Sequence, residues 1–149
     1  MPLFFVERIA RKDLQSNREA LFVFGDNERR IGLGGQAKEC RGEPNAVGVA
    51  TKRGPSMVYS ELWFDTDYDR CVAIIDQDMD PVFKHLNEGG VVVFPMHGIG
   101  TGLSQLPRNA PKIMEHIRLR VRELKHISNQ QQNQNTDTLN VFSSMFRDR

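Results

Sequence analysis

Two short apolar runs, each leading directly into a glycine-rich loop, are the features that most constrain the fold of this chain. The run LFVF at 21–24 continues into GDN at 25–27 and GLGG at 32–35, and the run VVVFPM at 91–96 continues into HGIGTG at 97–102. Uninterrupted apolar runs of this length are typical of parallel strands that are covered on both faces. Ligands of α/β proteins bind where such strands end, so the two loops predict one ligand held from two sides.

The remaining segments alternate between predicted strands and predicted helices. Further strands are predicted at 2–9 and 46–51, and a short helix at 36–41. Apolar residues recur every three or four positions at 68–86 and again at 113–124, which is typical of helices with one buried face. The order of elements predicts an α/β fold with three layers, in which helices cover both faces of a mostly parallel central sheet.

Local signals at the element boundaries are less decisive. Thr66 followed by Asp69 has the form of a capping box and predicts a helix start. Pro81 interrupts the apolar stripe of that helix, which is compatible with two short helices or with one kinked helix. Residues 10–19 are polar and are expected to form turns or a cap.

Length and composition favour one folded domain followed by a tail. The chain has 149 residues, and residues 128–137 contain no apolar side chain. Such a composition is typical of linkers and disordered segments. We therefore expect a domain at 1–127 and a polar linker with a C-terminal tail at 128–149. The apolar stretch at 139–146 could dock on the domain or on a neighbouring subunit, which would give self-association through the tail.

Charge and cysteine content narrow the class of protein. Twenty basic residues balance 19 acidic ones, so nothing in the net charge of +1 favours nucleic acid or a membrane as a partner. Cys40 and Cys71 have no metal-ligand spacing and are expected to be buried free thiols. The apolar opening is interrupted by charges and no apolar run approaches the length of a membrane-spanning helix, so a cytoplasmic location is expected.

Asp26 and Asn27 are the candidate catalytic residues. They follow the strand at 21–24 directly, and Asn27 offers both a donor and an acceptor to a ribose hydroxyl. Asp26 could accept a hydrogen bond from a hydroxyl or orient a water molecule. Gly-Asp-Asn is also a favoured turn sequence, and a purely structural turn is an equally good interpretation.

The second glycine loop is the candidate phosphate-binding segment. Alternating glycines at 98–102 tend to present successive backbone N–H groups to an anion, although a flexible surface loop would have the same composition. Lys52 and Arg53, which follow a predicted strand, could neutralise a phosphate or could be ordinary surface charges. No histidines or carboxylates have a metal-ligand spacing, and no cofactor is indicated.

Taken together, these segments resemble the macro domain family, which binds ADP-ribose. The resemblance rests on RKDL at 11–14, on the strand that ends in Gly25-Asp26-Asn27, on GLGGQA at 32–37 and on FPMHGIGTG at 94–102. The chain also resembles a group of short bacterial and phage proteins that carry the strings seen here at 25–27, 32–37, 41–46 and 98–102. The resemblance implies a macro-like fold and a nucleotide of the ADP-ribose type as the small-molecule partner.

The macro resemblance also implies roles for individual residues. Asp13 would contact the adenine amino group, and Asn27 would lie beside the distal ribose, where it is important for hydrolysis in enzymatic members. Gly34 and Gly35 would flank the distal ribose and the diphosphate. Gly98, Gly100, Thr101 and Gly102 would hold the phosphates, and Ile99 within the same loop is also expected to bind the ligand.

Three functions are compatible with these observations. The first is a domain that binds ADP-ribose or a related nucleotide and, in its enzymatic form, hydrolyses ADP-ribosyl or ADP-ribose phosphate derivatives. The second is a non-catalytic reader of the nucleotide or of a modified protein. The third is a nucleic-acid or assembly accessory protein that uses the basic face of the helix at 113–124 and the apolar tail. The even charge balance argues against this third function.

Overall fold

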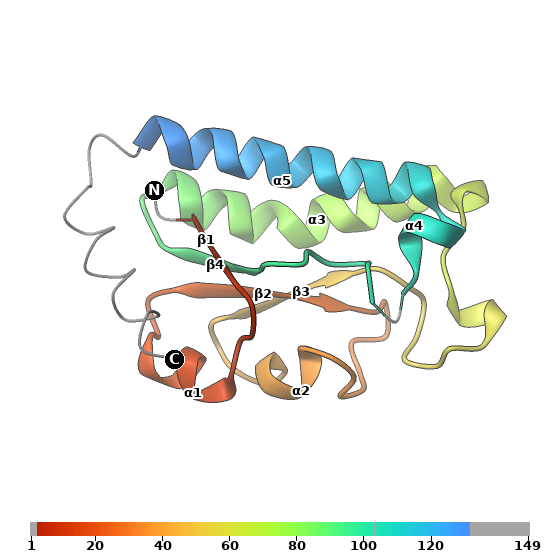
Figure 1. Cartoon of the computed structure of the whole chain (residues 1–149), viewed down its shortest axis with the longest axis horizontal. Coiled ribbons are helices and arrows are strands. Elements are labelled where there is room, and N and C mark those ends of the chain that lie inside the picture. Colours follow the sequence, from red (N-terminus) through yellow and green to blue (C-terminus); the bar gives the residue numbers. More distant parts are fainter. Residues whose placement is uncertain (1–2, 103, 132–149) are drawn as a thin grey trace.

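The computed structural model describes residues 3–102 and 104–131, which form an α/β domain around a parallel sheet (Figure 1). All strand pairs in this sheet are parallel, and the strand order is β1-β4-β2-β3. The predicted strands at the two apolar runs and at 46–51 are therefore confirmed. The strand bounds are Leu3–Val6 for β1, Leu21–Asp26 for β2, Ala46–Ala50 for β3 and Val92–Pro95 for β4.

Helices cover both faces of the sheet, so the expected three-layer architecture is present (Figure 1). Helices α3 and α5 lie side by side on one face, and the short helices α1 and α2 lie on the other. Helix α4 and two 3-10 turns lie in the connections at the end of the sheet where the strands finish. The bounds are Arg11–Ser16 for α1, Ala37–Cys40 for α2, Tyr68–Asn87 for α3, Leu106–Asn109 for α4, Pro111–Gln131 for α5, Tyr59–Glu61 for η1 and Asp65–Asp67 for η2.

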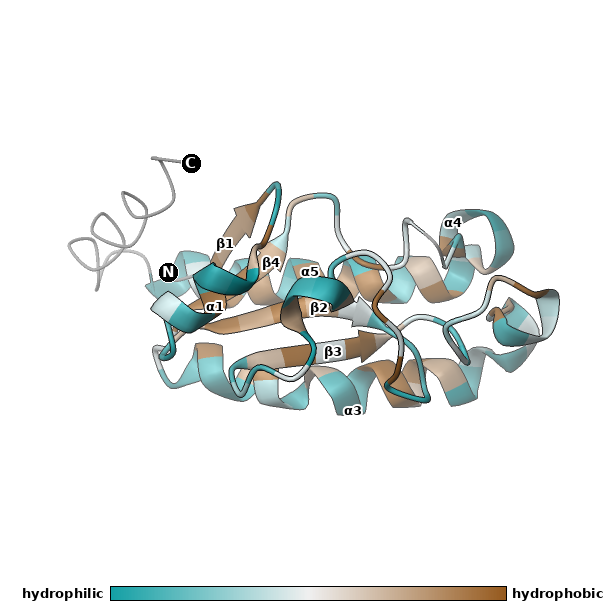
Figure 2. Cartoon of the chain, turned by 90° about the horizontal axis from the view of Figure 1, so that it is seen from below, coloured by the Kyte–Doolittle hydropathy of each residue, from teal (hydrophilic) through white to brown (hydrophobic). Residues whose placement is uncertain are grey.

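The alternation of side chains along the strands divides the core between the two faces. In β2, Phe22 and Phe24 pack with Leu14 and Cys40 on the α1 and α2 side, whereas Val23 packs on the α3 and α5 side. Because both faces are covered, every residue of a central strand can be apolar. Figure 2 shows this as strands coloured mainly hydrophobic between helices whose outer faces are hydrophilic.

Both cysteines are free and buried, as expected. Burial raises the pKa of the Cys40 thiol to about 12 and that of Cys71 to about 11. Neither thiol is ionised at neutral pH, so both behave as small apolar side chains of the core.

Three predictions about helix boundaries were wrong or incomplete. The polar segment 10–19 contains α1, whose Leu14 is fully buried. Helix α3 begins at Tyr68 after Asp67, and no side-chain cap is formed, so the capping box at Thr66 is absent. Pro81 lies within α3, so the interpretation as two short helices was wrong, and the buried stripe of the helix continues on both sides of the proline. That stripe consists of Cys71, Ile75, Met79, Val82 and Leu86.

Helix α5 extends further than the composition suggested. It runs to Gln131, so residues 128–131, expected to begin the linker, form its last turn. Ser128 is buried there, and Gln131 donates to the backbone oxygen of Leu86 at 3.1 Å. The rest of the predicted linker and tail lies outside the described residues. No helix in the described part of the chain is both long enough and apolar enough to span a membrane.

The strand register determines where the glycine loops meet. Asp26 at the end of β2 pairs with Ala50 at the end of β3, and Leu21 and Phe22 pair with Val92 and Val93 of β4. Because the three strands are parallel and adjacent, the segments that follow them emerge at the same edge of the sheet. This edge carries the candidate site.

Candidate functional site

A cavity of about 170 Å³ lies at the carboxyl ends of β2, β3 and β4. Three segments enclose it, one following each strand, so the two glycine loops face one space as the sequence suggested. The third segment, after β3, contributes Lys52, one of the two basic residues that the sequence offered for a phosphate, whereas Arg53 is not among the lining residues. The lining residues are Gly25, Asp26, Asn27, Ile31, Gly32, Gly34, Gly35, Gln36, Ala37, Arg41, Thr51, Lys52, Pro55, Pro95, Gly98, Ile99, Gly100, Gly102 and Ser104.

Two runs of backbone N–H groups in this wall have no acceptor within the described chain. The first run comprises residues 34–36, and the second comprises residues 99–102. Apart from Thr101, all of these residues line the cavity. N–H groups without an internal partner require water or a ligand as acceptor. The cavity wall is therefore rich in donors.

One contact and one glycine shape these loops. The Gln36 side chain accepts a hydrogen bond from the N–H of Ile9 at 2.9 Å and donates to the oxygen of Ile9 at 3.1 Å, which anchors the end of the first loop. Gly100 has a φ of +82°, and a Cβ there would lie 2.6 Å from Leu106 Cδ1. A glycine is thus required at this position of the second loop.

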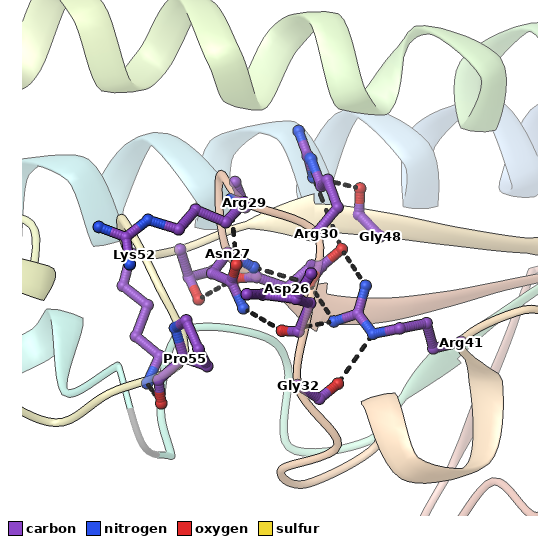
Figure 3. Close-up of polar contacts among 12 residues, drawn as sticks. Asp26, Asn27, Arg29, Arg30, Gly32, Arg41, Gly48, Lys52 and Pro55 are labelled. Carbon is purple, nitrogen blue, oxygen red and sulfur yellow. Dashed lines mark hydrogen bonds and ion pairs between the residues drawn. The ribbon is translucent and has the colours of Figure 1, made fainter.

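Asp26 is a buried carboxylate fully engaged by protein groups (Figure 3). Arg41 donates from Nη2 to Oδ1 at 2.5 Å and from Nη1 to Oδ2 at 3.2 Å, and the N–H of Asn27 donates to Oδ1 at 2.8 Å. Gly48 in β3 makes room for this group, since a Cβ there would lie 2.5 Å from Oδ2. Asp26 is held as an ion pair at the base of the loop.

Arg41 connects this ion pair to the glycine loop. Its Nε donates to the oxygen of Gly32 at 2.8 Å, and its Nη2 donates to that of Ile31 at 3.2 Å. One guanidinium therefore joins the end of β2 to the middle of the 27–36 loop. Asp26 and Arg41 together position the first run of N–H groups.

Asn27 closes a turn with its side chain. Nδ2 donates to the oxygen of Ile31 at 2.7 Å, and Oδ1 accepts from the N–H of Arg29 at 3.0 Å. Gly-Asp-Asn therefore forms the turn that the sequence allowed, and Asn27 lines the cavity as well. A catalytic role for Asn27 or Asp26 stays a prediction.

A buried pair of hydroxyl groups was not anticipated from the sequence. Thr51 Oγ1 and Ser104 Oγ share a hydrogen bond, and Thr51 Oγ1 also lies 3.2 Å from the oxygen of Asp26, to which it can donate. Both residues are buried and line the cavity. They give the site hydroxyl groups beside the backbone donors.

The other residues predicted for the site lie apart from the cavity lining. Asp13 is buried in α1, and its Oδ2 accepts the N–H of Ala10 at 2.8 Å. Thr101 is exposed and donates to the oxygen of His97 at 3.1 Å. The six predicted glycine and isoleucine residues at 34, 35, 98, 99, 100 and 102 all line the cavity. No cluster that could hold a metal ion occurs among the described residues.

Comparison with known proteins places the chain in a family. A search of the curated proteins and a search of the solved structures found no match. The model of the family described as "Family of unknown function (DUF7831)" matches residues 4–120, which include both glycine loops and all of the four strands except Leu3, the first residue of β1. Since this match covers more than half of the chain, the protein belongs to the DUF7831 family.

Proposed function

We propose that this protein binds ADP-ribose or a related nucleotide through its diphosphate. The observation that carries the proposal is the pair of N–H runs at 34–36 and 99–102, which have no acceptor among the described residues and which, apart from Thr101, belong to residues that line one cavity. Successive backbone N–H groups form a concave set of partial positive charges that suits phosphate oxygens. Two such runs, one after β2 and one after β4, suit a ligand with two linked phosphates better than a ligand with a single phosphate.

The polar groups elsewhere in the cavity suit the sugar of such a ligand. The hydroxyl groups of Thr51 and Ser104 can exchange hydrogen bonds with ribose hydroxyls. The resemblance to macro domains points to the same ligand class. A cytoplasmic location, expected from the sequence, stays part of this proposal.

Binding without hydrolysis is the function that the geometry supports best. Asp26 is occupied by Arg41 and by the N–H of Asn27, and the Asn27 side chain closes its own turn. A general base must reach the proton that it removes, and a carboxylate tied at both oxygens has little freedom to do so. We therefore propose a reader of the nucleotide, with hydrolysis of ADP-ribosyl derivatives as the alternative that the experiment decides.

The test is a calorimetric titration of the wild-type protein with ADP-ribose, with ADP and NAD as comparators. Gly102 is the position for a matched pair of variants, because it lines the cavity and a Cβ there meets nothing within 4 Å. Gly102→Glu places a negative charge beside the phosphates and should abolish binding, whereas Gly102→Ala should bind nearly as the wild type does. Absence of heat with all three ligands would refute the proposal.

Hydrolysis is examined with the same proteins. The wild type is incubated with an ADP-ribosylated protein and with an ADP-ribose phosphate, and the released products are separated by chromatography. Binding of ADP-ribose without release of product from either compound is the expected result. If the wild type releases product and Asn27→Ala does not, the proposal of a non-catalytic reader is refuted and the protein is a hydrolase.

A further inference from the structure

Lys52 is a buried ammonium group that has no carboxylate partner in the described part of the chain. The residue is 6% exposed and follows β3. Its Nζ donates to the oxygen of Pro55 at 3.1 Å and, at longer range, to that of Ser56 at 3.4 Å and to the sulfur of Met57 at 3.6 Å. Figure 3 shows the side chain running toward Pro55 and away from the Asp26 cluster.

Unlike Lys52, three arginines near the cavity each have a carboxylate partner. Arg41 pairs with Asp26 at 2.5 Å, Arg30 pairs with Asp78 at 2.6 Å, and Arg29 pairs with Glu61 at 2.7 Å. Glu61 is the acid whose charge acts on Lys52, but it forms its ion pair with Arg29. Lys52 is left with neutral acceptors.

A buried charge without a counter-charge is unfavourable. Burial lowers the pKa of Lys52, and the attraction of Glu61 offsets this in part. Hydrogen bonds to two carbonyl oxygens solvate the ammonium group but do not neutralise it. An anion in the cavity would supply the missing negative charge. Lys52 lines the same cavity as the two runs of free N–H groups.

We propose that Lys52 is the cation of this site and that a phosphate of the ligand is its missing counter-charge. On binding, Nζ exchanges its long contacts with Ser56 and Met57 for a phosphate oxygen. The ligand is then defined by its phosphates, so a diphosphate without a base or sugar binds, whereas an uncharged nucleoside does not. The inference rests on the proposed function for the identity of the nucleotide, but the charge argument requires a phosphate alone.

The test uses inorganic pyrophosphate, ADP-ribose and adenosine as probes of the full-length protein. Lys52→Met keeps the length of the side chain and removes the charge, and Lys52→Arg keeps the charge. Lys84→Met, on the exposed side of α3, is the matched control. Dissociation constants are measured by calorimetry, and the midpoint of thermal unfolding is measured without ligand.

Lys52→Met should weaken the binding of pyrophosphate by about tenfold to a hundredfold, the range expected for one charge-assisted hydrogen bond. Its unfolding midpoint without ligand should equal or exceed that of the wild type, because an uncompensated buried charge has been removed. Lys52→Arg should keep most of the affinity, and Lys84→Met should change neither quantity. Adenosine should not bind to any of the proteins.

Two results, one with pyrophosphate and one without ligand, would each overturn the inference. One is a Lys52→Met variant that binds pyrophosphate as tightly as the wild type, and the other is a variant that unfolds well below the wild type without ligand, which would make Lys52 a tie for residues 55–57. A wild type that binds pyrophosphate but not ADP-ribose would leave the inference standing and refute the proposed function. Conversely, a Lys52→Met variant that binds ADP-ribose as tightly as the wild type would overturn the inference and leave the proposed function standing.

Discussion

Replacement of Arg41 by methionine should lower the free energy of unfolding by about 2–3 kcal/mol at pH 7. The Asp26 side chain is 3% exposed and that of Arg41 is 21% exposed, so the variant leaves a buried carboxylate without its main partner. Breaking a buried ion pair in this way costs about 3–5 kcal/mol. The partial exposure of Arg41, and a second guanidinium on Arg30 at 3.8 Å from Asp26, reduce the expected loss.

A double-mutant cycle separates the ion pair from the other effects of the substitution. Asp26→Asn removes the charge with little change in size, and the variant with both substitutions should lose less stability than the sum of the two single losses. We expect a coupling energy of about 1–2 kcal/mol. Urea unfolding, followed by the fluorescence of the single tryptophan, Trp63, and extrapolated to water, gives the four free energies.

The matched control is an ion pair of ordinary surface type on α5. Arg122 and Glu115 lie 3.2 Å apart, with side chains 59% and 58% exposed. The same cycle there should give no more than about 0.5 kcal/mol, because water screens both charges. If the losses at Asp26 and Arg41 add to within about 0.5 kcal/mol, the pair does not stabilise the loop and the structural interpretation of Asp26 is wrong.

Two further predictions concern groups outside the cavity. Burial alone would raise the pKa of Glu28, but hydrogen bonds from Arg70 at 2.7 Å and Trp63 at 2.8 Å lower it below its ordinary value of 4.5. This carboxylate therefore stabilises the fold above that pH, and the stabilisation is lost as the pH falls through the lower pKa of the folded state. Glu28→Gln should accordingly destabilise the protein at pH 7, and in urea unfolding the difference should shrink in acid. A difference independent of pH would contradict this. Iodoacetamide at pH 8 should leave Cys40 and Cys71 unmodified in the folded protein and alkylate both in urea, as measured by mass spectrometry. An adduct on the folded protein would show that a thiol is accessible.

The strands were predictable because their signal is local. A continuous apolar run such as 21–24 is compatible with a strand that is covered on both faces, and the glycines that follow it mark its end. Helix α1 was missed because it contributes Leu14 as its one apolar residue to the core, too few for a periodic pattern. The strand order was not predictable, since a parallel sheet places strands beside each other that are distant in sequence.

The candidate site was predictable in its backbone and not in its side chains. The glycine loops at 32–35 and 98–102 stand out in the sequence, and both line the cavity. Arg41 and Ser104 carry no signal of their own, because their partners, Asp26 and Thr51, are brought to them by the strand register. The sequence Gly-Asp-Asn is compatible both with a structural turn and with a catalytic dipeptide. Only the contacts of the side chains distinguish these two interpretations.

The position of β4 in the sheet bears on how the protein assembles. Val92 pairs with Leu3 on one side and with Leu21 on the other, so β4 fills the gap between two strands that are synthesised long before it. Until the ribosome has released β4, β1 and β2 each have an unpaired apolar edge, which is a site for aggregation or for a chaperone. The second glycine loop follows β4 directly, so the nascent chain acquires its complete sheet and its complete cavity in the same step. Ligand binding by a growing chain would thus report that the sheet is complete.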